Sequence, residues 1–396
     1  MFEYSRSSDT FPMSYPNTVS NFANSTVSPD YVWEFLEQLD WYQFVNERIP
    51  TFVFLLVISV IGIIGNSHAI VIFRKYPLSS VTVLIRWIVH VDLLACFICI
   101  PLELVHIRHR YTYQLRILCK ITRYSTHFTS FSSGVLLLLA AIERRQKICA
   151  PFNWQLSFRK AKCVGIFVLA STGIISVPAA VYYDVFDHKT SKPVFVGRDC
   201  RDSKGFEQAK MYALFVLVII LSGFLVCTVA YIQIIKVIRT QLEIEQNRSK
   251  SNSLWETRFA AEESEQNSRR ASLKEKVENL EISENTCNNS DTLSRTPKSP
   301  REKRYKDSWT ITMMIMIATG ISFVGYMLHF CAVIMKTTFH PETLDKIRPV
   351  YILIIRGYFL QSAIHPLIYC IVDKTFRKEG KTVYRKTINR LRSRKK

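Results

Sequence analysis

Seven long apolar runs divide this chain of 396 residues. They lie near residues 51–75, 80–106, 117–142, 162–183, 208–237, 309–335 and 348–372. A helix needs about 20 mostly apolar residues to cross a bilayer, and each run is long enough to do so. The third run is the least apolar, so its serines, Ser133 among them, are expected to face other helices rather than lipid. The pattern predicts an all-α membrane protein, a bundle of seven membrane-spanning helices.

The orientation in the membrane follows from the charges beside the runs. Residues 1–49 carry two basic and seven acidic side chains, whereas residues 373–396 carry eleven basic and two acidic ones. Basic residues concentrate on the cytoplasmic side, so the N-terminus is expected outside the plasma membrane and the C-terminus inside. No signal peptide is evident, and the first run is expected to direct insertion. Asn24, in Asn24-Ser25-Thr26, is then a predicted glycosylation site.

Several function classes are argued against by the same sequence. The formal net charge of +20 does not indicate nucleic-acid binding, because the basic residues are spread over the inner and outer loops of a membrane protein. No phosphate-binding loop, zinc-ligand spacing or nucleophile elbow is present. We therefore expect no enzyme activity, no metal-ligand cluster and no organic cofactor.

Cysteine placement predicts one disulfide. Of the ten cysteines, only Cys119 and Cys200 fall on the outer side, where the compartment is oxidising. Cys119 begins the third run, and Cys200 lies in the loop between the fourth and fifth runs. A disulfide between them is the simplest interpretation, and two free thiols are the alternative.

The chain is expected to divide into five regions. These are an extracellular N-terminal tail (1–49), helices one to five with their loops (50–241), a disordered third cytoplasmic loop (242–307), helices six and seven (308–372) and a basic cytoplasmic tail with a short amphipathic helix (373–396). Disorder is predicted for 242–307 because it has thirteen acidic and thirteen basic residues and no sustained apolar period. Arg269-Arg270-Ala271-Ser272 in this loop resembles a kinase site, and the basic ends of the loop suit contact with the lipid bilayer.

The spacing of individual landmarks carries a family resemblance. The landmarks, from the first run to the tail, are Gly65-Asn66, His90-Val91-Asp92-Leu93-Leu94, Pro101, Cys119, Arg144 twenty-five residues later, Pro151, Pro178, Tyr231, His365-Pro366-Leu367-Ile368-Tyr369 and Phe376. In this joint spacing, over roughly residues 50–380, the chain resembles the rhodopsin-like (class A) family of G-protein-coupled receptors. Outside the family, a membrane transporter is the alternative, which should show internal repeats with broken helices.

The resemblance implies how signalling would work. In the family, an acid and an arginine at the inner end of the third helix pair and hold the receptor inactive, and Glu143 and Arg144 match those positions. On activation Arg144 would meet Tyr231 and a heterotrimeric G protein. Pro366 and Tyr369 match the end of the seventh helix that takes part in this switch. Arrestin and kinases are further expected partners.

The resemblance also implies an allosteric sodium ion at Asp92, a carboxylate deep in the second run. Ser133 matches a usual partner from the third helix. Gln361 and His365, however, stand where asparagines are usual. Sodium binding and a neutral, hydrogen-bonded Asp92 are both open at this point.

Other departures from the family pattern indicate a divergent receptor. Met327 and His329 stand where a tryptophan and a helix-kinking proline are usual. Amine receptors place an aspartate where this chain has Thr126, and opsins need a lysine where it has Phe359. Neither class therefore fits.

The outer mouth of the bundle is expected to hold the ligand, and it is polar and mostly basic. The candidates for ligand contact are Glu103, Arg123, Thr126, His127, Tyr326, His329 and Arg356. Arg123 and Arg356 could hold a carboxylate of the ligand, or Glu103 could pair with one of them. A short hairpin is predicted within residues 192–201, pinned by Cys200. These features favour an extracellular neuropeptide ligand, with a chemosensory receptor for a small molecule as the alternative.

Overall fold

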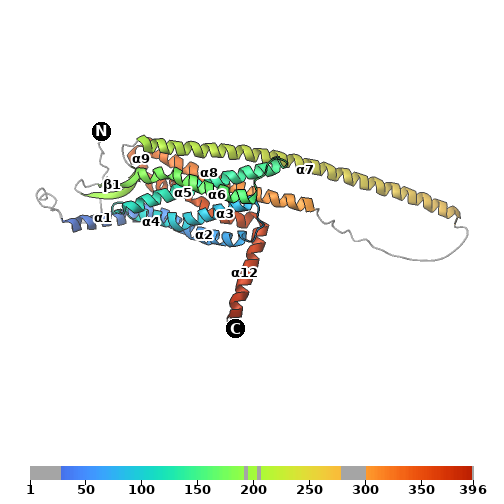
Figure 1. The fold of residues 1–396 in the computed structure, drawn as a ribbon, viewed down its shortest axis with the longest axis horizontal. Helices are drawn as coiled ribbons and strands as arrows, with labels where there is room; N and C mark the ends of the chain where they lie inside the picture. The colour runs from blue at the N-terminus through green and yellow to red at the C-terminus, as the bar shows by residue number, and fades with distance from the viewer. Residues whose placement is uncertain (1–27, 191–194, 203–206, 278–299, 395–396) are drawn as a thin grey trace.

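The structure is a computed structural model, and it describes residues 28–190, 195–202, 207–277 and 300–394. Within these residues, seven helical stretches are long and apolar enough to cross a membrane. They are Pro29–Phe73, Ser80–Arg108, Arg116–Cys149, Phe158–Tyr182, Met211–Arg248, Trp309–Lys336 and Arg348–Val372. The predicted seven-helix bundle is thus confirmed, and its helices run side by side along the long axis (Figure 1).

Three of these seven stretches are assembled from shorter elements, and the other four each lie in a single helix. The first joins α1 (Pro29–Gln43), a π-helical turn (Phe44–Arg48) and α2 (Ile49–Phe73), and the second joins α3 (Ser80–Leu94), a π turn (Ala95–Cys99) and α4 (Ile100–Arg108). The third and fourth are α5 (Arg116–Cys149) and α6 (Phe158–Tyr182). The fifth to seventh lie in α7 (Glu207–Val277), in α8 (Pro300–Thr338), and in α10 (Arg348–Ile354) with a 3₁₀ turn (Gly357–Phe359) and α11 (Leu360–Val372). The short α9 (Pro341–Lys346) precedes α10.

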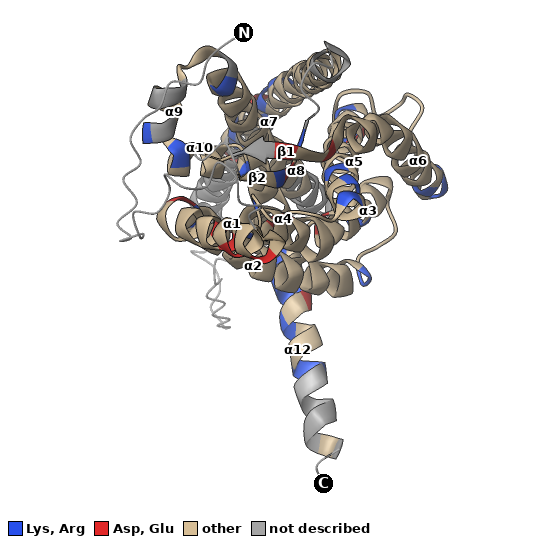
Figure 2. Ribbon diagram, turned by 90° about the vertical axis from the view of Figure 1, so that its left-hand side faces the viewer, with Lys and Arg blue, Asp and Glu red and all other residues tan. Residues whose placement is uncertain are grey.

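The two ends of the bundle differ. At one end, called the hairpin end, β1 (Tyr183–Lys189) and β2 (Val196–Asp202) form an antiparallel hairpin in which Val185 is opposite Cys200. At the other, called the tail end, the chain leaves the bundle in α12 (Lys374–Arg394). Figure 2 looks onto the hairpin end, where the two strands cross the middle of the ring of helices.

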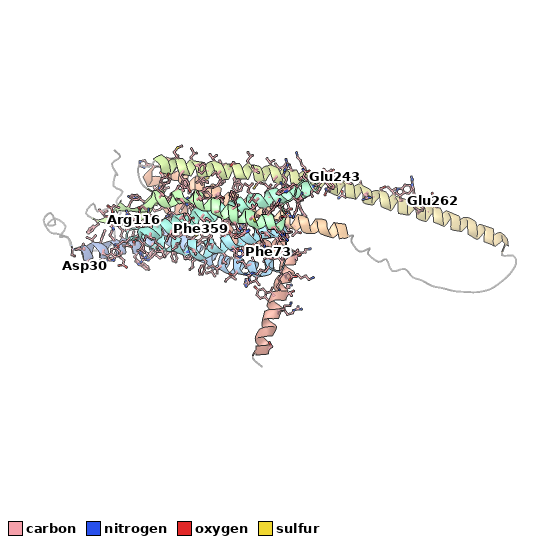
Figure 3. All side chains as sticks on the ribbon, viewed as in Figure 1. Asp30, Phe73, Arg116, Glu243, Glu262 and Phe359 are labelled. Atoms are coloured by element: carbon pink, nitrogen blue, oxygen red, sulfur yellow. A yellow bond between two sulfur atoms is a disulfide. The ribbon has the colours of Figure 1, made fainter. Side chains whose placement is uncertain are left out.

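The bundle is apolar inside and on much of its outside. Leu84, Leu136 and Ile88 are among the fully buried side chains of the main core, and Phe73 lies in this core toward the tail end (Figure 3). On α6, by contrast, Phe167 is 72% and Ile174 is 73% exposed. Such apolar outer faces suit contact with lipid, where helices keep their backbone hydrogen bonds internal.

The hairpin prediction is confirmed in part. The second strand coincides with the predicted Cys200 segment, but the first strand is 183–189, earlier than the predicted 192–201. The predicted disulfide between Cys119 and Cys200 is present, with the two Cα atoms 5.6 Å apart. It fixes the hairpin to the first turn of α5.

Residues 29–43, predicted as part of a tail, form α1 and extend the first spanning helix. Ser28 accepts a hydrogen bond from the backbone N–H of Tyr31, and Pro29 occupies the first turn, where its missing N–H has no partner to lose. The carboxylate of Asp40 is fully buried and accepts the backbone N–H groups of Arg110, Tyr111 and Thr112 at 2.8, 2.9 and 3.1 Å. It thereby fastens α1 to the loop before α5.

The third cytoplasmic loop also differs from the prediction of disorder. Helix α7 continues to Val277, well past the bundle, and α8 begins at Pro300 rather than near 308. Glu262 lies on the projecting part of α7 (Figure 3). The physical reason is that residues 224–277 contain no glycine or proline, so nothing in the chain breaks the helix. Residues 278–299 lie outside the described part, as does the predicted glycosylation site Asn24.

The predicted amphipathic helix of the basic tail is present as α12. In Figure 1 it leaves the tail end across the direction of the bundle. Phe376, in its first turn, is buried and packs on Phe73 with ring centroids 5.4 Å apart. This contact sets where α12 leaves the bundle.

Candidate functional site

A cavity of about 910 Å³ lies inside the hairpin end. Its walls come from the spanning helices and from β2. All seven predicted ligand candidates line it: Glu103, Arg123, Thr126, His127, Tyr326, His329 and Arg356. Residues up to 253 positions apart in the sequence are therefore gathered around one space.

Glu103 is the carboxylate around which the basic side chains of this cavity gather. The π turn before α4 lets the helix accommodate Pro101 and places Glu103 inward, where it is 1% exposed. Arg356 donates from Nε and Nη2 to its Oε1 at 2.8 and 2.7 Å, and Arg123 Nη1 lies 3.4 Å from Oε2. Of the alternatives left open by the sequence, pairing of Glu103 with an arginine is the one present, and it involves both arginines.

The cluster continues to the hairpin through His106, which is not one of the seven candidates but follows Glu103 at the outer mouth in the sequence. Its Nε2 lies 3.2 Å from Asp199 on β2, and its Nδ1 lies 3.5 Å from Glu103. His106 lies on the same face of α4 as Glu103, three residues on. Through His106, Asp199 of the hairpin is thus linked to Glu103 in the cavity.

The hairpin is also held at its start. Arg116 Nε lies 2.8 Å and Lys120 Nζ 3.5 Å from the carboxylate of Asp184 on β1. Burial acts to raise the pKa of this carboxyl, but the backbone N–H of Val185 and the two cations outweigh it and hold the pKa below its ordinary value. Asp184 is therefore an ionised anchor between β1 and α5.

Three of the other four candidates have hydrogen-bond partners on the backbone. His127 Nδ1 lies 2.9 Å from the carbonyl of Arg123, and His329 Nδ1 lies 2.6 Å from that of Ile355. Tyr326 donates to the carbonyl of Ser130 at 3.0 Å. Within the described residues, Arg123 Nε and Thr126 Oγ1 are buried without a hydrogen-bond partner. These two groups lie one helical turn apart on the cavity wall, so donors are available there.

A second cluster lies at the tail end, around Glu143. The predicted ion pair is present, with Arg144 Nε 2.7 Å from Glu143 Oε2. Glu143 also lies 2.6 Å from Lys147 Nζ and accepts a hydrogen bond from the hydroxyl of Ser80 on α3. The carboxylate is 2% and Arg144 4% exposed, so the pair is closed inside the bundle.

Sequence reasoning missed Lys147 and Ser80. Lys147 is four residues after Glu143 on the same helix, which is the spacing of a helical ion pair. Ser80 comes from a different helix, and only the fold brings it to Glu143. Arg145, next in the chain, is exposed and contacts Gln233 on α7.

The remaining switch candidates come from α7 and α11. Tyr231 on α7 exchanges a hydrogen bond of 2.9 Å with Thr319 on α8. Tyr369 is buried, and its ring centroid lies 5.3 Å from that of Phe73. Pro366 is buried within α11. Arg144 and Tyr231 therefore have different hydrogen-bond partners in this arrangement, Glu143 and Thr319.

Asp92, the predicted sodium site, lies deep in the bundle. His365 Nδ1 is 2.6 Å from its Oδ2, and Ser133 donates to its Oδ1 at 3.4 Å. Both Asp92 and His365 are 0% exposed. The fold thus brings Asp92 and Ser133 together, with His365 as a further partner.

Fold and sequence together define the class of this protein. The sequence profile of the family described as "7 transmembrane receptor (rhodopsin family)" matches residues 65–369. The chain belongs to this family, so it is a multi-pass membrane receptor, and the prediction that it is not an enzyme is confirmed.

Within the family, the chain is similar to neuropeptide Y receptors. It is 31% identical to neuropeptide Y receptor type 6 of Mus musculus over 140 residues, which are 35% of this chain and 37% of that receptor. It is 30% identical to type 4 of Rattus norvegicus over 141 residues, 34% of this chain and 38% of the relative. For type 1 of Xenopus laevis the identity is 28% over 139 residues, 35% and 38% of the two chains. Each match spans less than two fifths of the relative's length.

Proposed function

We propose that this receptor binds a neuropeptide in the cavity at the hairpin end, which faces the cell exterior, and activates a heterotrimeric G protein at the tail end. The observation that carries the proposal is the convergence of the seven candidates on one cavity beneath a disulfide-fixed hairpin. The neuropeptide Y receptors among its relatives support a peptide as the ligand class. The basic tail and α12 support the assignment of the tail end to the cytoplasm.

The charge of the cavity supports a ligand with a carboxylate. Six basic side chains line it, Arg48, Arg110, Arg123, Arg201, Lys336 and Arg356, against the acidic Glu103 and Asp199. Arg123 Nε and Thr126 Oγ1 add buried donors without partners among the described residues. A carboxylate seated there would receive charge-assisted hydrogen bonds and balance the excess of arginine. An acidic side chain or a free C-terminus of the peptide supplies such a group.

Signalling would follow from the cluster around Glu143. In the arrangement described, Arg144 is buried and paired with Glu143, and Tyr231 is hydrogen-bonded to Thr319. A ligand that favours a different packing of the helices shifts the equilibrium by its difference in affinity for the two packings. Release of Arg144 from Glu143 would then expose a cation at the tail end for the G protein.

Kinases and arrestin are proposed to act at the same end, as the kinase-like motif at 269–272 suggests. Asn24, in the N-terminal region, is proposed to be glycosylated.

The proposal is tested with G-protein activation in cells that express the receptor and are exposed to tissue extract. Activity that is lost when the extract is digested with protease is the expected result. In a separate arm, amidation of the carboxyl groups in undigested extract is expected to reduce activity, because it removes the charge that Arg123 and Arg356 would bind. Activity that survives digestion would instead mean a small-molecule ligand. Cells that express Arg144→Ala at the same surface level serve as the control for receptor dependence.

A further inference from the structure

Asp92 is a carboxylate in the apolar middle of the bundle, and its charge needs a partner there. An ionised group without one is costly in such a place, so membrane-buried carboxylates pair with a cation or with strong donors. The family resemblance supplies a sodium ion at this position. The residues around Asp92 decide whether that ion fits this chain.

The donors around Asp92 do not suit a sodium ion. A hard cation prefers a shell of oxygen ligands. Here the Oδ2 atom of Asp92 lies 2.6 Å from a ring nitrogen of His365, and the Ser133 hydroxyl is the oxygen donor hydrogen-bonded to the carboxylate among the described residues, 3.4 Å from Oδ1. At the second altered position, Gln361 donates its amide to the hydroxyl of Tyr326 at 3.2 Å. At the first altered position a nitrogen therefore faces Asp92 in place of the usual oxygen. At the second, the amide nitrogen of Gln361 is bound to a neighbouring helix, and its Oε1 is buried without a hydrogen-bond partner among the described residues.

The imidazole does more than remove a ligand. An ionised carboxylate can only accept, so the tautomer of His365 that suits such an Asp92 carries a proton on Nδ1 and donates it to the carboxylate. That N–H points its positive end at the oxygen that would otherwise face an ion. A metal ion near it would meet a donor hydrogen instead of a lone pair, and this holds for the neutral and the protonated ring alike.

We propose that His365 takes the place of the sodium ion, so that this receptor is held by a built-in Asp92–His365 tie and does not respond to sodium. The tie joins α3 to α11 next to Pro366, and both partners are completely buried. In a sodium-dependent receptor, the ion's concentration sets how firmly the two helices are joined at this level. Here the partner is covalently part of the chain, and its local concentration is fixed by the fold.

The test compares melting curves of the purified full-length receptor in detergent, in sodium chloride and in choline chloride at equal ionic strength. An ion that binds only the folded state raises the melting temperature. The wild-type receptor is expected to melt at the same temperature in both salts. The variant His365→Asn restores an oxygen ligand and is expected to melt several degrees higher in sodium than in choline. Adding Asp92→Asn to that variant is expected to abolish the difference. His90→Asn makes the same substitution at an exposed position of α3 and should behave as wild type.

Two results would overturn the proposal. One is a sodium-specific rise in the melting temperature of the wild type that Asp92→Asn removes, which would place the ion at Asp92 despite His365. The other is a folded His365→Asn receptor that remains indifferent to sodium, which would mean that the imidazole is not what excludes the ion. The first comparison needs only the wild type and Asp92→Asn, so it decides the question even where His365→Asn does not fold.

Discussion

At the scale of single residues, a buried glutamate organises the arginines at each end of this receptor. Glu103 draws Arg123 and Arg356 together from α5 and from the α10–α11 segment, and Glu143 holds Arg144 at the other end. Buried ion pairs are costly to form but more costly to leave half broken. Each carboxylate therefore determines where its arginines lie, and its removal frees them.

Replacing Glu103 with Gln is expected to lower the free energy of unfolding by about 3 kcal/mol, because two largely buried guanidinium groups lose their counter-charge. Thermal unfolding of the purified receptor measures this loss. Glu37→Gln, an exposed position on α1, is the matched control and should leave the melting curve unchanged. Equal melting of Glu103→Gln and wild type would mean that the arginines are already satisfied without Glu103.

At the scale of elements, the hairpin end is a stack of three layers. Helix α1 lies against the loop before α5, and that loop lies against β2. Arg198 on β2 exchanges backbone hydrogen bonds with Tyr111 and Tyr113, at 2.8 and 3.1 Å. Gly197 is required at this contact, because a Cβ there would come within 2.9 Å of the Tyr111 carbonyl oxygen. The stack covers the ring of helices above the cavity.

The disulfide anchors this stack to the bundle. Cys200→Ser is expected to destabilise the receptor by about 4 kcal/mol, because the bond closes a loop with a sequence separation of 81. The loss should appear in thermal unfolding and as reduced surface expression. Cys331→Ser removes a free, exposed cysteine and is the control. A Cys200→Ser receptor as stable as this control would show that the hairpin holds its place without the bond.

Asp40 has a separate role, since it fastens α1 rather than the bundle. Asp40→Asn removes the charge that accepts three backbone N–H groups and the Thr112 hydroxyl, and it is expected to weaken the docking of α1 by about 2 kcal/mol. Hydrogen exchange should then speed up over residues 29–43 while the spanning helices keep their protection. Asp30→Asn, on the exposed first turn, should change neither. Unchanged exchange in Asp40→Asn would mean that apolar contacts such as Phe35 on Phe195 suffice to hold α1.

At the scale of the whole molecule, the spanning helices and the candidates around the cavity were predictable, because apolar runs and landmark spacing are local properties of the chain. The cap Ser28-Pro29-Asp30 is a sequence signal for the start of helix α1. The mostly polar residues around it favour an unstructured tail instead, so composition alone does not predict this helix. The charged composition of residues 242–277 favours disorder, and the one sequence signal for the full extent of α7 is the absence of glycine and proline over 224–277. Pairing of His365 with Asp92, 273 residues away, depends on the fold and has no local signal.

We propose that the pairing of Glu143 with Arg144 holds this receptor inactive toward G proteins. The most direct measurement is nucleotide exchange on purified heterotrimeric G proteins of each major class, catalysed by the purified receptor without ligand. Glu143→Gln is expected to raise exchange several-fold above wild type, because it weakens the ion pair that keeps Arg144 buried. Glu143→Gln combined with Arg144→Ala should return exchange to the receptor-free rate, whereas Arg145→Ala, next to it but exposed, should match wild type. Exchange by Glu143→Gln that stays at the receptor-free rate with every class of G protein would contradict the claim.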